Sequence, residues 1–467
     1  KNPDGSLRLY NEVSPGETVG EAGIILEQRR FADVTALRDS TIAVLHRGRF
    51  EELLMRHPVA LNRVFAQAVY HQLRHTPQRP EHRRAHAFVV VPLHSDISAL
   101  TVADGLTLAL AGYGRAFRVD AKSNEKYQLD ELEAEFDFLI YQADLKDSEW
   151  TRRAFRQADQ VIYVAAVGDS PDLCEIEPRL GAEPGFSMKR QHFALLHSAN
   201  AKSPGDLASW REGRQIERVY PLRDGRPEDF SRFARFLTGQ AVGLVLGGGG
   251  ARGFAHLGVL RALAESHIPV DVIGGNSMGA LIGAQYACGL GLDEIREQTM
   301  RFALGGERPT LPVISLLSGR RLERDLRKMF GDQRIEQLWS PFFAAACNLS
   351  QACTTVQESG LLWRAVLASN SPAGLLPPVL RDGDLLVDGA ILDNVPVGAM
   401  RSRLGTPFEQ RRGNGKIIAI DVDVREELGV DPALARLSVR KTIRSYFSAS
   451  AESSPGIGNI LYRAGHI

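Results

Sequence analysis

The sequence predicts an α/β protein of several domains, and three observations lead to this prediction. The chain has 467 residues, which at roughly 100–200 residues per domain corresponds to about two to four domains. Strand-like and helical segments alternate over residues 87–222, a pattern typical of a parallel sheet. From residue 241 onward, glycine-rich turns join short apolar strands to helices, so we expect a second α/β domain there.

The composition and the charge of the chain are ordinary for a globular protein. Hydrophobic residues make up 44% and charged residues 24%, so there is enough apolar material for packed cores. The 56 basic residues equal the 56 acidic residues in number. No overall electrostatic field would therefore attract nucleic acid, and we expect no nucleic-acid partner. No apolar run reaches the roughly 18 residues of a membrane-spanning helix.

Cysteine usage points away from disulfides and metal sites. The four cysteines are scattered and form neither a C-x-x-C pair nor a His/Cys ligand spacing: Cys174, Cys288, Cys347 and Cys353. We therefore expect a reducing compartment, either the cytoplasm or the cytoplasmic face of a membrane. The pattern also predicts neither a structural zinc nor another metal.

Residues 1–76 begin with short β-type runs and end with a helical pattern. Residues 32–50 predict two strands, and apolar residues at helical spacing from Leu53 to Val69 predict a helix. The next stretch, 77–86, holds prolines and basic residues, which is typical of a linker. A solvated linker is favoured over a lipid-binding cluster because no amphipathic face accompanies these charges.

Residues 87–222 predict an α/β domain without a phosphate-binding loop. The first strand is followed by PLHSDISAL, which lacks the G-x-x-x-x-G-K-[ST] pattern of nucleotide-hydrolysing enzymes. Asp144 follows a strand at the position of a magnesium-binding acid, but no glycine-rich turn near it would hold a phosphate. A structural scaffold is therefore favoured over an ATPase. Residues 223–240 predict a connector with a short amphipathic helix.

A glycine-rich turn opens the region that carries the chemistry. The strand Val242 to Leu246 leads into GGGGARG, and a helix follows. Glycines let backbone N–H groups converge on an anion at a helix N-terminus, either a phosphate or a carbonyl oxygen that develops charge. A dinucleotide site is the alternative, because the turn also contains G-x-G-x-x-G. That site needs an acid after the second strand, whereas Asp271 precedes this strand.

The second motif is a serine turn between a strand and a helix. Gly275 and Gly279 flank Ser277 in G-x-S-x-G, where side chains would clash in a sharp elbow. A serine hydroxyl is a poor nucleophile until a base accepts its proton. The usual base is a histidine, but after Ser277 the chain contains only His466. The base must therefore be sought elsewhere.

The third motif supplies a candidate base. In VDGA, Asp388 follows a strand-like run and precedes a glycine turn. A carboxylate within hydrogen-bond reach of a serine can act as general base, and partial burial raises its pKa toward neutrality. Asp384 and Asp393 compete for this role, but Asp384 lies in an exposed hairpin pattern and Asp393 in a turn or cap pattern. His256 and His267 are interpreted as structural histidines.

These three motifs, in this order, resemble the patatin-like phospholipase family over residues 241–424. The resemblance implies a three-layer α/β/α hydrolase domain and a Ser/Asp dyad, with Ser277 as nucleophile and Asp388 as base. The segment ASNSPAGLLPPV between the last two motifs also fits the family. By the same resemblance, the oxyanion hole would use backbone N–H groups of the glycine turn, with an arginine holding the loop: Gly248, Gly249, Gly250 and Arg252.

The N-terminal region is similar to a cyclic nucleotide-binding domain, which implies a partial β-roll over residues 1–76. The resemblance assigns Gly20 and Glu21 to the start of the phosphate-binding helix and Arg30 to the cyclic phosphate. Phe31 and Asp33 depart from the family's pattern, and the Asp33 charge would oppose a bound anion. A degenerate regulatory fold is therefore favoured over one that binds cyclic nucleotide.

The complete series of domains resembles the neuropathy target esterase class. The resemblance implies hydrolysis of phospholipids or lysophospholipids at a membrane surface, without a metal or an organic cofactor. The alternative is a cyclic-nucleotide-responsive regulatory protein in which hydrolysis is secondary. The chain begins at Lys1 within a strand-like pattern, and members of the class continue beyond the point where it stops. We therefore expect a piece of a longer protein, with 425–467 a truncated C-terminal segment and an upstream anchor left open.

Overall fold

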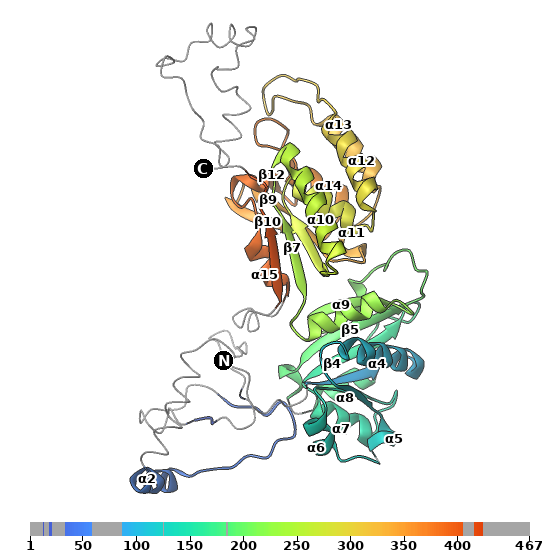
Figure 1. Ribbon diagram of the computed structural model, residues 1–467, viewed down its shortest axis with the longest axis vertical. Helices are drawn as coiled ribbons and strands as arrows, with labels where there is room; N and C mark the ends of the chain where they lie inside the picture. The colour runs from blue at the N-terminus through green and yellow to red at the C-terminus, as the bar shows by residue number, and fades with distance from the viewer. Residues whose placement is uncertain are drawn as a thin grey trace. The chain divides into compact units, whose positions relative to one another are not determined.

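The structure, a computed structural model, describes residues 13, 18–20, 33–57, 86–124, 126–183, 185–404 and 415–423. The described residues form two compact units that divide between Gln240 and Ala241 (Figure 1). Each unit contains a β-sheet covered by α-helices. The predicted α/β class is therefore confirmed.

The sheet of the first unit is parallel throughout. Its strand order is β2-β3-β1-β4-β5-β6, and every neighbouring pair runs in the same direction. The strands are β1 (His86–Pro92), β2 (Ala116–Val119), β3 (Phe138–Gln142), β4 (Gln160–Ala166), β5 (Arg190–His197) and β6 (Arg218–Arg223). The central strand β1 is a continuous apolar run because helices cover both faces of the sheet, so the predicted parallel sheet is confirmed.

The helices of the first unit include the one expected in the connector. They are α4 (Asp96–Leu110), α5 (Ala121–Asn124), α6 (Leu129–Glu135), α7 (Glu149–Gln157), α8 (Ile176–Gly181) and α9 (Pro227–Leu237), with the short 3-10 turns η1 (Phe186–Met188) and η2 (Ser209–Arg211). The apolar face of α9 packs on α4, where a Cβ atom on Gly105 would lie 2.5 Å from the Phe230 ring. Helix α9 is therefore part of the core of this unit.

The described N-terminal residues differ from the expected strand pattern. Residues 33–46 contain no strand in the part that the structure describes, and α2 (Arg47–Arg56) begins inside the range where we expected strands. The neighbouring strands expected for this segment would come from residues 1–32, which lie almost entirely outside the description. Instead, the Arg38 side chain forms ion pairs with Asp159 and Glu133 of the first unit. The rest of the helix predicted up to Val69 lies outside the described residues.

The second unit contains a mixed sheet. Its order is β11-β12-β9-β8-β7-β13, and β10 pairs with β9 off this path. The strands are β7 (Val242–Leu246), β8 (Val272–Gly275), β9 (Phe342–Asn348), β10 (Cys353–Gln357), β11 (Val379–Arg381), β12 (Asp384–Asp388) and β13 (Lys416–Ile420). The run from β13 to β9 is parallel, whereas β10, β11 and β12 pair antiparallel. The carboxyl ends of β7 and β8 thus lie at one edge of the sheet.

Helices cover both faces of this sheet (Figure 1). One face carries α15 (Val397–Leu404), and the other carries α10 (Ala255–Glu265), α11 (Met278–Ala287) and α14 (Leu362–Ser369), with α12 (Leu292–Ala303) and α13 (Arg320–Phe330) further along the chain. Alternation along β7 produces the two faces, because Gly243 lies against Met400 of α15 while Leu244 packs with Leu260 and Leu281. The predicted three-layer α/β/α arrangement is therefore confirmed.

Candidate active site

Ser277 lies on a strained turn between β8 and α11. Strand β8 ends at Gly275 and α11 begins at Met278, so Asn276 and Ser277 alone make the turn. Ser277 has φ 51° and ψ −124°, a backbone conformation that favours glycine. A non-glycine residue in such a region costs on the order of 1–3 kcal/mol, and the surrounding contacts must hold it there. The half-buried serine occupies the N-cap position of α11, directly after the carboxyl end of β8.

The two glycines that flank the serine let β7 approach the turn. A Cβ atom on either Gly275 or Gly279 would overlap the backbone oxygen of Leu246 far inside van der Waals contact. The obstacle is backbone rather than a flexible side chain, so it cannot move aside without displacing β7. The two glycines of G-x-S-x-G are therefore needed because β7, β8 and α11 approach one another closely at this turn.

Asp388 is brought to Ser277 by the end of β12. The side chain of Ser277 lies near enough to the Asp388 carboxyl to lower its pKa, and the Ala390 N–H donates a hydrogen bond of 3.0 Å to Asp388 Oδ1. Burial raises the pKa of Asp388 to about 6, while the Ser277 side chain and the Ala390 N–H both lower it. A carboxylate with a pKa near 6 can accept a proton at neutral pH far better than an exposed aspartate.

Three consecutive residues at the end of α14 contact both sides of this pair. The Ser277 N–H donates to Ser369 Oγ at 2.9 Å, and Asn370 Nδ2 donates to the Ser277 carbonyl at 2.9 Å. The Asp388 N–H donates to the Ser371 carbonyl, also at 2.9 Å. The segment 369–371 therefore fixes the backbone of the serine turn and the backbone of the aspartate turn at the same time.

Asn276 connects the two turns directly. Its side-chain oxygen accepts hydrogen bonds from Ser369 Oγ at 3.0 Å and from the Gly389 N–H at 3.1 Å. Its amide nitrogen donates to the Asp393 carbonyl at 3.4 Å, and the residue is fully buried. Sequence reasoning assigned no role to Asn276 or to residues 369–371. Asn276 occupies a variable position of G-x-S-x-G, and residues 369–371 lie in the segment ASNSP. Nothing in these two sequence segments indicates that they contact each other.

The glycine-rich turn lies next to the serine, and its N–H groups have different environments. The Gly248 N–H donates to Asn394 Oδ1 at 3.0 Å, so it is not free to bind a substrate oxygen as we expected. In the described part of the chain, the N–H groups of Gly249 and Gly250 have no hydrogen-bond acceptor. Gly250 has φ 54°, which glycine adopts without strain. Of the three N–H groups predicted for the oxyanion hole, those of Gly249 and Gly250 therefore remain candidates.

Two further contacts hold the glycine-rich turn in place. Arg252, for which a loop-holding role was predicted, forms an ion pair of 2.7 Å with Asp423, just beyond β13. His256 is fully buried, and its Nε2 donates to the Gly247 carbonyl at 2.8 Å. Burial lowers the pKa of His256, so the ring is neutral at physiological pH. His267 lies exposed just after α10.

The competing carboxylates have other partners. Asp384 Oδ2 accepts hydrogen bonds of 2.8 Å from Asn348 Nδ2 and from Gln351 Nε2 at the start of β12. Asp393 is half-buried, and burial raises the pKa of its carboxyl. The side chain of Ser277 lies beside the Asp388 carboxyl and lowers its pKa. The geometry therefore favours Asp388 over both alternatives.

Comparison with known families decides what kind of domain this is. Residues 244–401 match the family described as "Patatin-like phospholipase". The chain carries a patatin-like phospholipase domain. Two further matches precede it: residues 114–221 match the "Neuropathy Target Esterase family P-loop like domain" and residues 1–57 match the "Cyclic nucleotide-binding domain". The predicted resemblance, including its N-terminal part, is confirmed.

Three relatives that align with about 90% of this chain have names that refer to the same families. The chain is 30% identical to "Patatin-like phospholipase domain-containing protein 7" of Rattus norvegicus, over 91% of this chain and 36% of that protein. It is 28% identical to "Neuropathy target esterase sws" of Drosophila melanogaster, over 91% and 34%. It is 30% identical to "Lysophospholipase NTE1" of Yarrowia lipolytica, over 89% and 35%. The chain thus spans about a third of the length of these relatives.

The cyclic nucleotide-binding match covers residues that are only partly described. Gly20 has φ 91°, a conformation that suits glycine at the start of a binding loop. Glu21 and Arg30, to which the resemblance assigned the ribose and the phosphate, lie outside the described residues. Their roles stay predictions.

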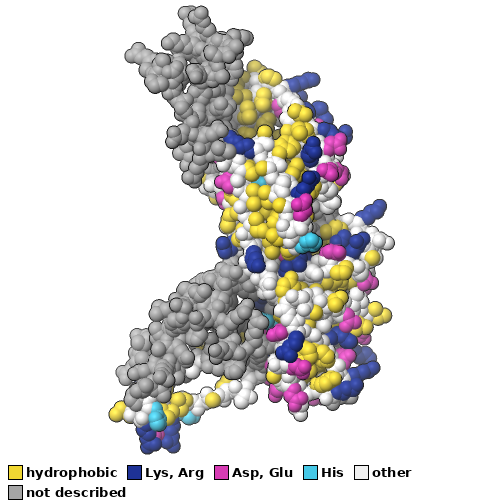
Figure 2. Space-filling model, viewed as in Figure 1, with side chains coloured by type: hydrophobic (Ala, Val, Ile, Leu, Met, Phe, Trp, Pro, Cys, Tyr) yellow, Lys and Arg dark blue, Asp and Glu magenta, His cyan; other side chains and the backbone are white. Residues whose placement is uncertain are grey.

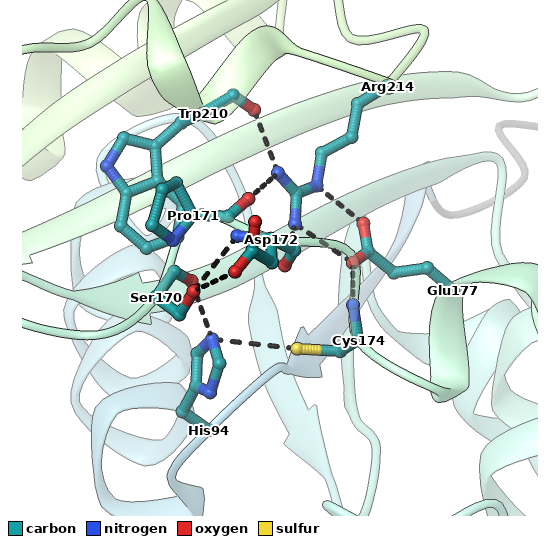
Figure 3. A network of polar contacts seen from close by, with 8 residues as sticks. All are labelled: His94, Ser170, Pro171, Asp172, Cys174, Glu177, Trp210 and Arg214. Carbon is teal, nitrogen blue, oxygen red and sulfur yellow. Dashed lines mark hydrogen bonds and ion pairs between the residues drawn. The ribbon is translucent and has the colours of Figure 1, made fainter.

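A network of polar contacts in the first unit connects the end of β1 with the segment that follows β4. His94 follows β1, and its Nε2 lies 3.0 Å from the Ser170 carbonyl and 3.5 Å from Cys174 Sγ (Figure 3). In the same network, the Arg214 guanidinium is bound by Glu177 at 2.6 Å and by backbone carbonyls, so its charge is already balanced. The preference for a structural scaffold over an ATPase stays a prediction.

The described residues contain neither a cluster of side chains suited to bind a metal ion nor a helix suited to span a membrane. Within those residues, no group of three or more His, Cys, Asp or Glu side chains could hold a metal ion. The carboxylate of Asp144, which has the sequence position of a magnesium-binding acid, accepts a hydrogen bond of 2.6 Å from Ser148 Oγ. Among the described helices, none is both long enough and apolar enough to cross a membrane.

Proposed function

We propose that this protein hydrolyses carboxylic ester bonds of phospholipids or lysophospholipids, with Ser277 as nucleophile and Asp388 as general base. The observation that carries the proposal is the buried Asp388 carboxyl beside the side chain of Ser277, which lies on a strained turn. The lipid substrate class is supported by the patatin-like phospholipase match and by relatives named as a lysophospholipase and as esterases.

The first half of the reaction forms an acyl-enzyme. Asp388 accepts the proton of Ser277 Oγ while this oxygen attacks the ester carbonyl carbon. The carbonyl oxygen gains negative charge in the tetrahedral intermediate, and the N–H groups of Gly249 and Gly250 donate hydrogen bonds to it. The C–O bond to the alcohol then breaks, and Asp388 returns its proton to the departing alcohol oxygen.

The second half of the reaction releases the fatty acid. Asp388, again ionised, removes a proton from a water molecule that attacks the acyl carbon of the Ser277 ester. The new tetrahedral intermediate uses the same backbone N–H groups, and its collapse transfers the proton from Asp388 to Ser277 Oγ. The carboxylic acid leaves and the starting state is restored. These steps use protein groups and water alone.

The test compares two substitutions at the pair with a control serine. Ser277→Ala and Asp388→Asn should each lower turnover of a lysophosphatidylcholine and of a short p-nitrophenyl ester by roughly 10³-fold or more. Ser266→Ala changes an exposed serine after α10 and should leave both rates near those of the wild type. A fluorophosphonate probe should label the wild type and the Ser266→Ala variant but not Ser277→Ala. Unchanged turnover in the Ser277→Ala variant contradicts the mechanism.

A second proposal concerns the N-terminal region, and the match of residues 1–57 to a cyclic nucleotide-binding domain favours it. In this alternative, a cyclic nucleotide binds through Glu21 and Arg30 and changes the hydrolytic rate. Calorimetric titration of the folded chain with cAMP and with cGMP should then release heat, and Arg30→Ala should abolish it. Absence of heat in the wild type supports a degenerate fold, which the Asp33 charge favours.

A further inference from the structure

The connection between α12 and α13 exposes large apolar side chains. Leu304, Leu311, Val313 and Ile314 retain 79%, 80%, 85% and 71% of their accessible surface. We call residues 304–314 the apolar loop. Single exposed apolar side chains are common, but four in one short segment form a patch of the kind that binds a partner or a membrane. Figure 2 shows hydrophobic side chains gathered at this end of the second unit.

Hydrogen bonds fix both ends of the apolar loop to the rest of the second unit, and its apolar side chains stay exposed between them. The Glu307 carboxylate accepts hydrogen bonds from the Leu322 N–H at 2.6 Å and from Ser318 Oγ at 3.0 Å. Just after the tip, the Leu316 N–H donates to the Gly374 carbonyl at 3.0 Å. Backbone and side-chain hydrogen bonds therefore hold both ends of the loop while its apolar side chains remain outside the core.

The apolar loop lies on the active-site side of the unit. Its anchor, Gly374, comes three residues after Ser371, which contacts the backbone of Asp388. Two further exposed apolar residues, Ile391 and Leu392, follow Asp388 in the next turn. The loop and the candidate site are thus joined through one short segment, residues 371–374.

Positive charge accompanies the loop. Helix α13 begins six residues beyond the loop and contains five basic and two acidic side chains, RRLERDLRKMF. Both acidic side chains are paired within the helix, Asp325 with Arg321 and Glu323 with Arg327. Three other basic side chains are exposed and have no ion-pair partner among the described residues: Arg320, Arg324 and Lys328. Unpaired cations beside an apolar tip complement an anionic lipid surface.

We propose that the apolar loop inserts into a lipid surface with anionic headgroups, while the exposed cations of α13 contact the headgroup phosphates. The loop would thereby hold the candidate site against the membrane, where an acyl chain can pass from the lipid to Ser277. This last clause rests on the proposed hydrolytic function, whereas the docking itself does not. A second copy of the chain is the competing occupant of the patch.

The first experiment measures vesicle binding of the full chain. In co-sedimentation with phosphatidylcholine vesicles that contain phosphatidylserine, the triple variant Leu311→Ser, Val313→Ser, Ile314→Ser should lose about tenfold or more in binding. The matched control is Ile97→Ser with Leu108→Ser, two side chains on α4 with 77% and 75% exposure. The control should bind as the wild type does. Equal binding by the triple variant and the wild type overturns the proposal.

The second experiment reports insertion directly. A tryptophan placed by Val313→Trp should be quenched by vesicles of brominated phosphatidylcholine mixed with phosphatidylserine, beyond any quenching of the wild type. A tryptophan placed by Leu108→Trp should not be. Absence of additional quenching for Val313→Trp means that the loop does not enter the bilayer, and this overturns the proposal. Circular dichroism confirms that both variants are folded.

The remaining arms separate charge, self-association and the proposed function. Replacing Arg320, Arg324 and Lys328 by glutamine should weaken binding to anionic vesicles several-fold. A triple serine variant that changes the size of the protein in gel filtration without changing vesicle binding overturns the proposal in favour of a second copy. If Ser277→Ala leaves ester turnover intact while the loop variants abolish vesicle binding, the hydrolytic proposal fails and the docking proposal stands.

Discussion

The backbone N–H of Ser277 donates a hydrogen bond of 2.9 Å to the hydroxyl oxygen of Ser369, the last residue of α14. Ser369 in turn donates to Asn276, so one hydroxyl supports two adjacent residues of the serine turn. Because the Ser277 conformation is strained, such external contacts must hold it. The orientation of the proposed nucleophile therefore depends on a helix that lies far along the chain.

Substitution of Ser369 should impair turnover more than substrate binding. Ser369→Ala removes the acceptor of the Ser277 N–H, which costs about 1–3 kcal/mol of folding free energy when a buried group is left unpaired. We expect kcat to fall while KM changes little, since the serine is misdirected but the lipid contacts remain. Ser371→Ala is the comparison, because its contact with Asp388 uses the backbone carbonyl that alanine retains. An equal loss in both variants contradicts this role for the Ser369 hydroxyl.

The strain at Ser277 predicts a difference between two inactive variants. Glycine adopts φ 51° and ψ −124° readily, whereas alanine does not. Ser277→Gly should therefore be more stable than Ser277→Ala by about 1 kcal/mol or more. Urea unfolding of the two variants measures this difference. Equal midpoints and slopes for the two variants would mean that the turn stores no strain.

The pKa of Asp388 predicts the pH dependence of turnover. Burial raises this pKa to about 6, and only the ionised carboxylate can accept the Ser277 proton. The value of kcat/KM for an uncharged ester should therefore rise through pH 6 and level off above it. The measurement is a pH profile of kcat/KM with a substrate that does not titrate. A profile that is flat from pH 5 to pH 8 would falsify the assignment of Asp388 as base.

The raised pKa of Asp388 also predicts how folding stability changes with pH. Turnover should rise as the pH increases, whereas the stability that this group contributes should fall. The folded pKa of about 6 exceeds the ordinary value of 3.8, so the folded state holds the proton more tightly than the unfolded state. Stability from this group is full below pH 4 and is lost as the pH rises to 6, on the order of 3 kcal/mol in total. Asp388→Asn removes this loss, so its stability relative to the wild type should increase between pH 4 and pH 7. Denaturant titrations at both pH values check the sign.

The close approach at Gly279 predicts a severe effect from one methyl group. Gly279→Ala drives a Cβ atom into the Leu246 backbone oxygen, so it should destabilise the unit by about 1–3 kcal/mol or more and abolish turnover. Gly258 in α10 provides the control, since its Cβ would meet nothing within 4 Å. Gly258→Ala should stabilise the helix by about 0.5–1 kcal/mol. Thermal unfolding of both variants tests the pair, and a stable, active Gly279→Ala variant would contradict the geometry.

The sequence predicted those parts of the site that local patterns encode. Ser277 and Asp388 each follow a strand and precede a tight turn, and such turns leave a signature of neighbouring glycines. The contact between Ser369 and Ser277 left no comparable signature, because it depends on how α14 packs beside β9. The direction of the Gly248 N–H was also hidden, since Asn394, which binds it, comes from a distant loop.

The N-terminal region shows the limit of reading strands from short apolar runs. The sequence of residues 33–46 predicts strands, but this segment pairs with no other strand in the described part of the chain. A strand exists only where another backbone accepts and donates its hydrogen bonds, and no local pattern supplies that partner. In the first unit, by contrast, β1 was predicted because a fully apolar run fits the centre of a parallel sheet.

Strand β13 pairs with β7 in parallel, and the Asp423 carboxylate beyond it binds Arg252 of the glycine-rich turn. On the ribosome, Ser277 and Asp388 are both synthesised before this strand. A nascent chain therefore carries the serine turn and the aspartate turn before β7 has β13 as a neighbour and before Arg252 can bind the Asp423 carboxylate. If the site acts as proposed, its hydrolytic activity should begin only after residues 416–423 have left the ribosome. Ester cleavage is then delayed until β13 has paired with β7.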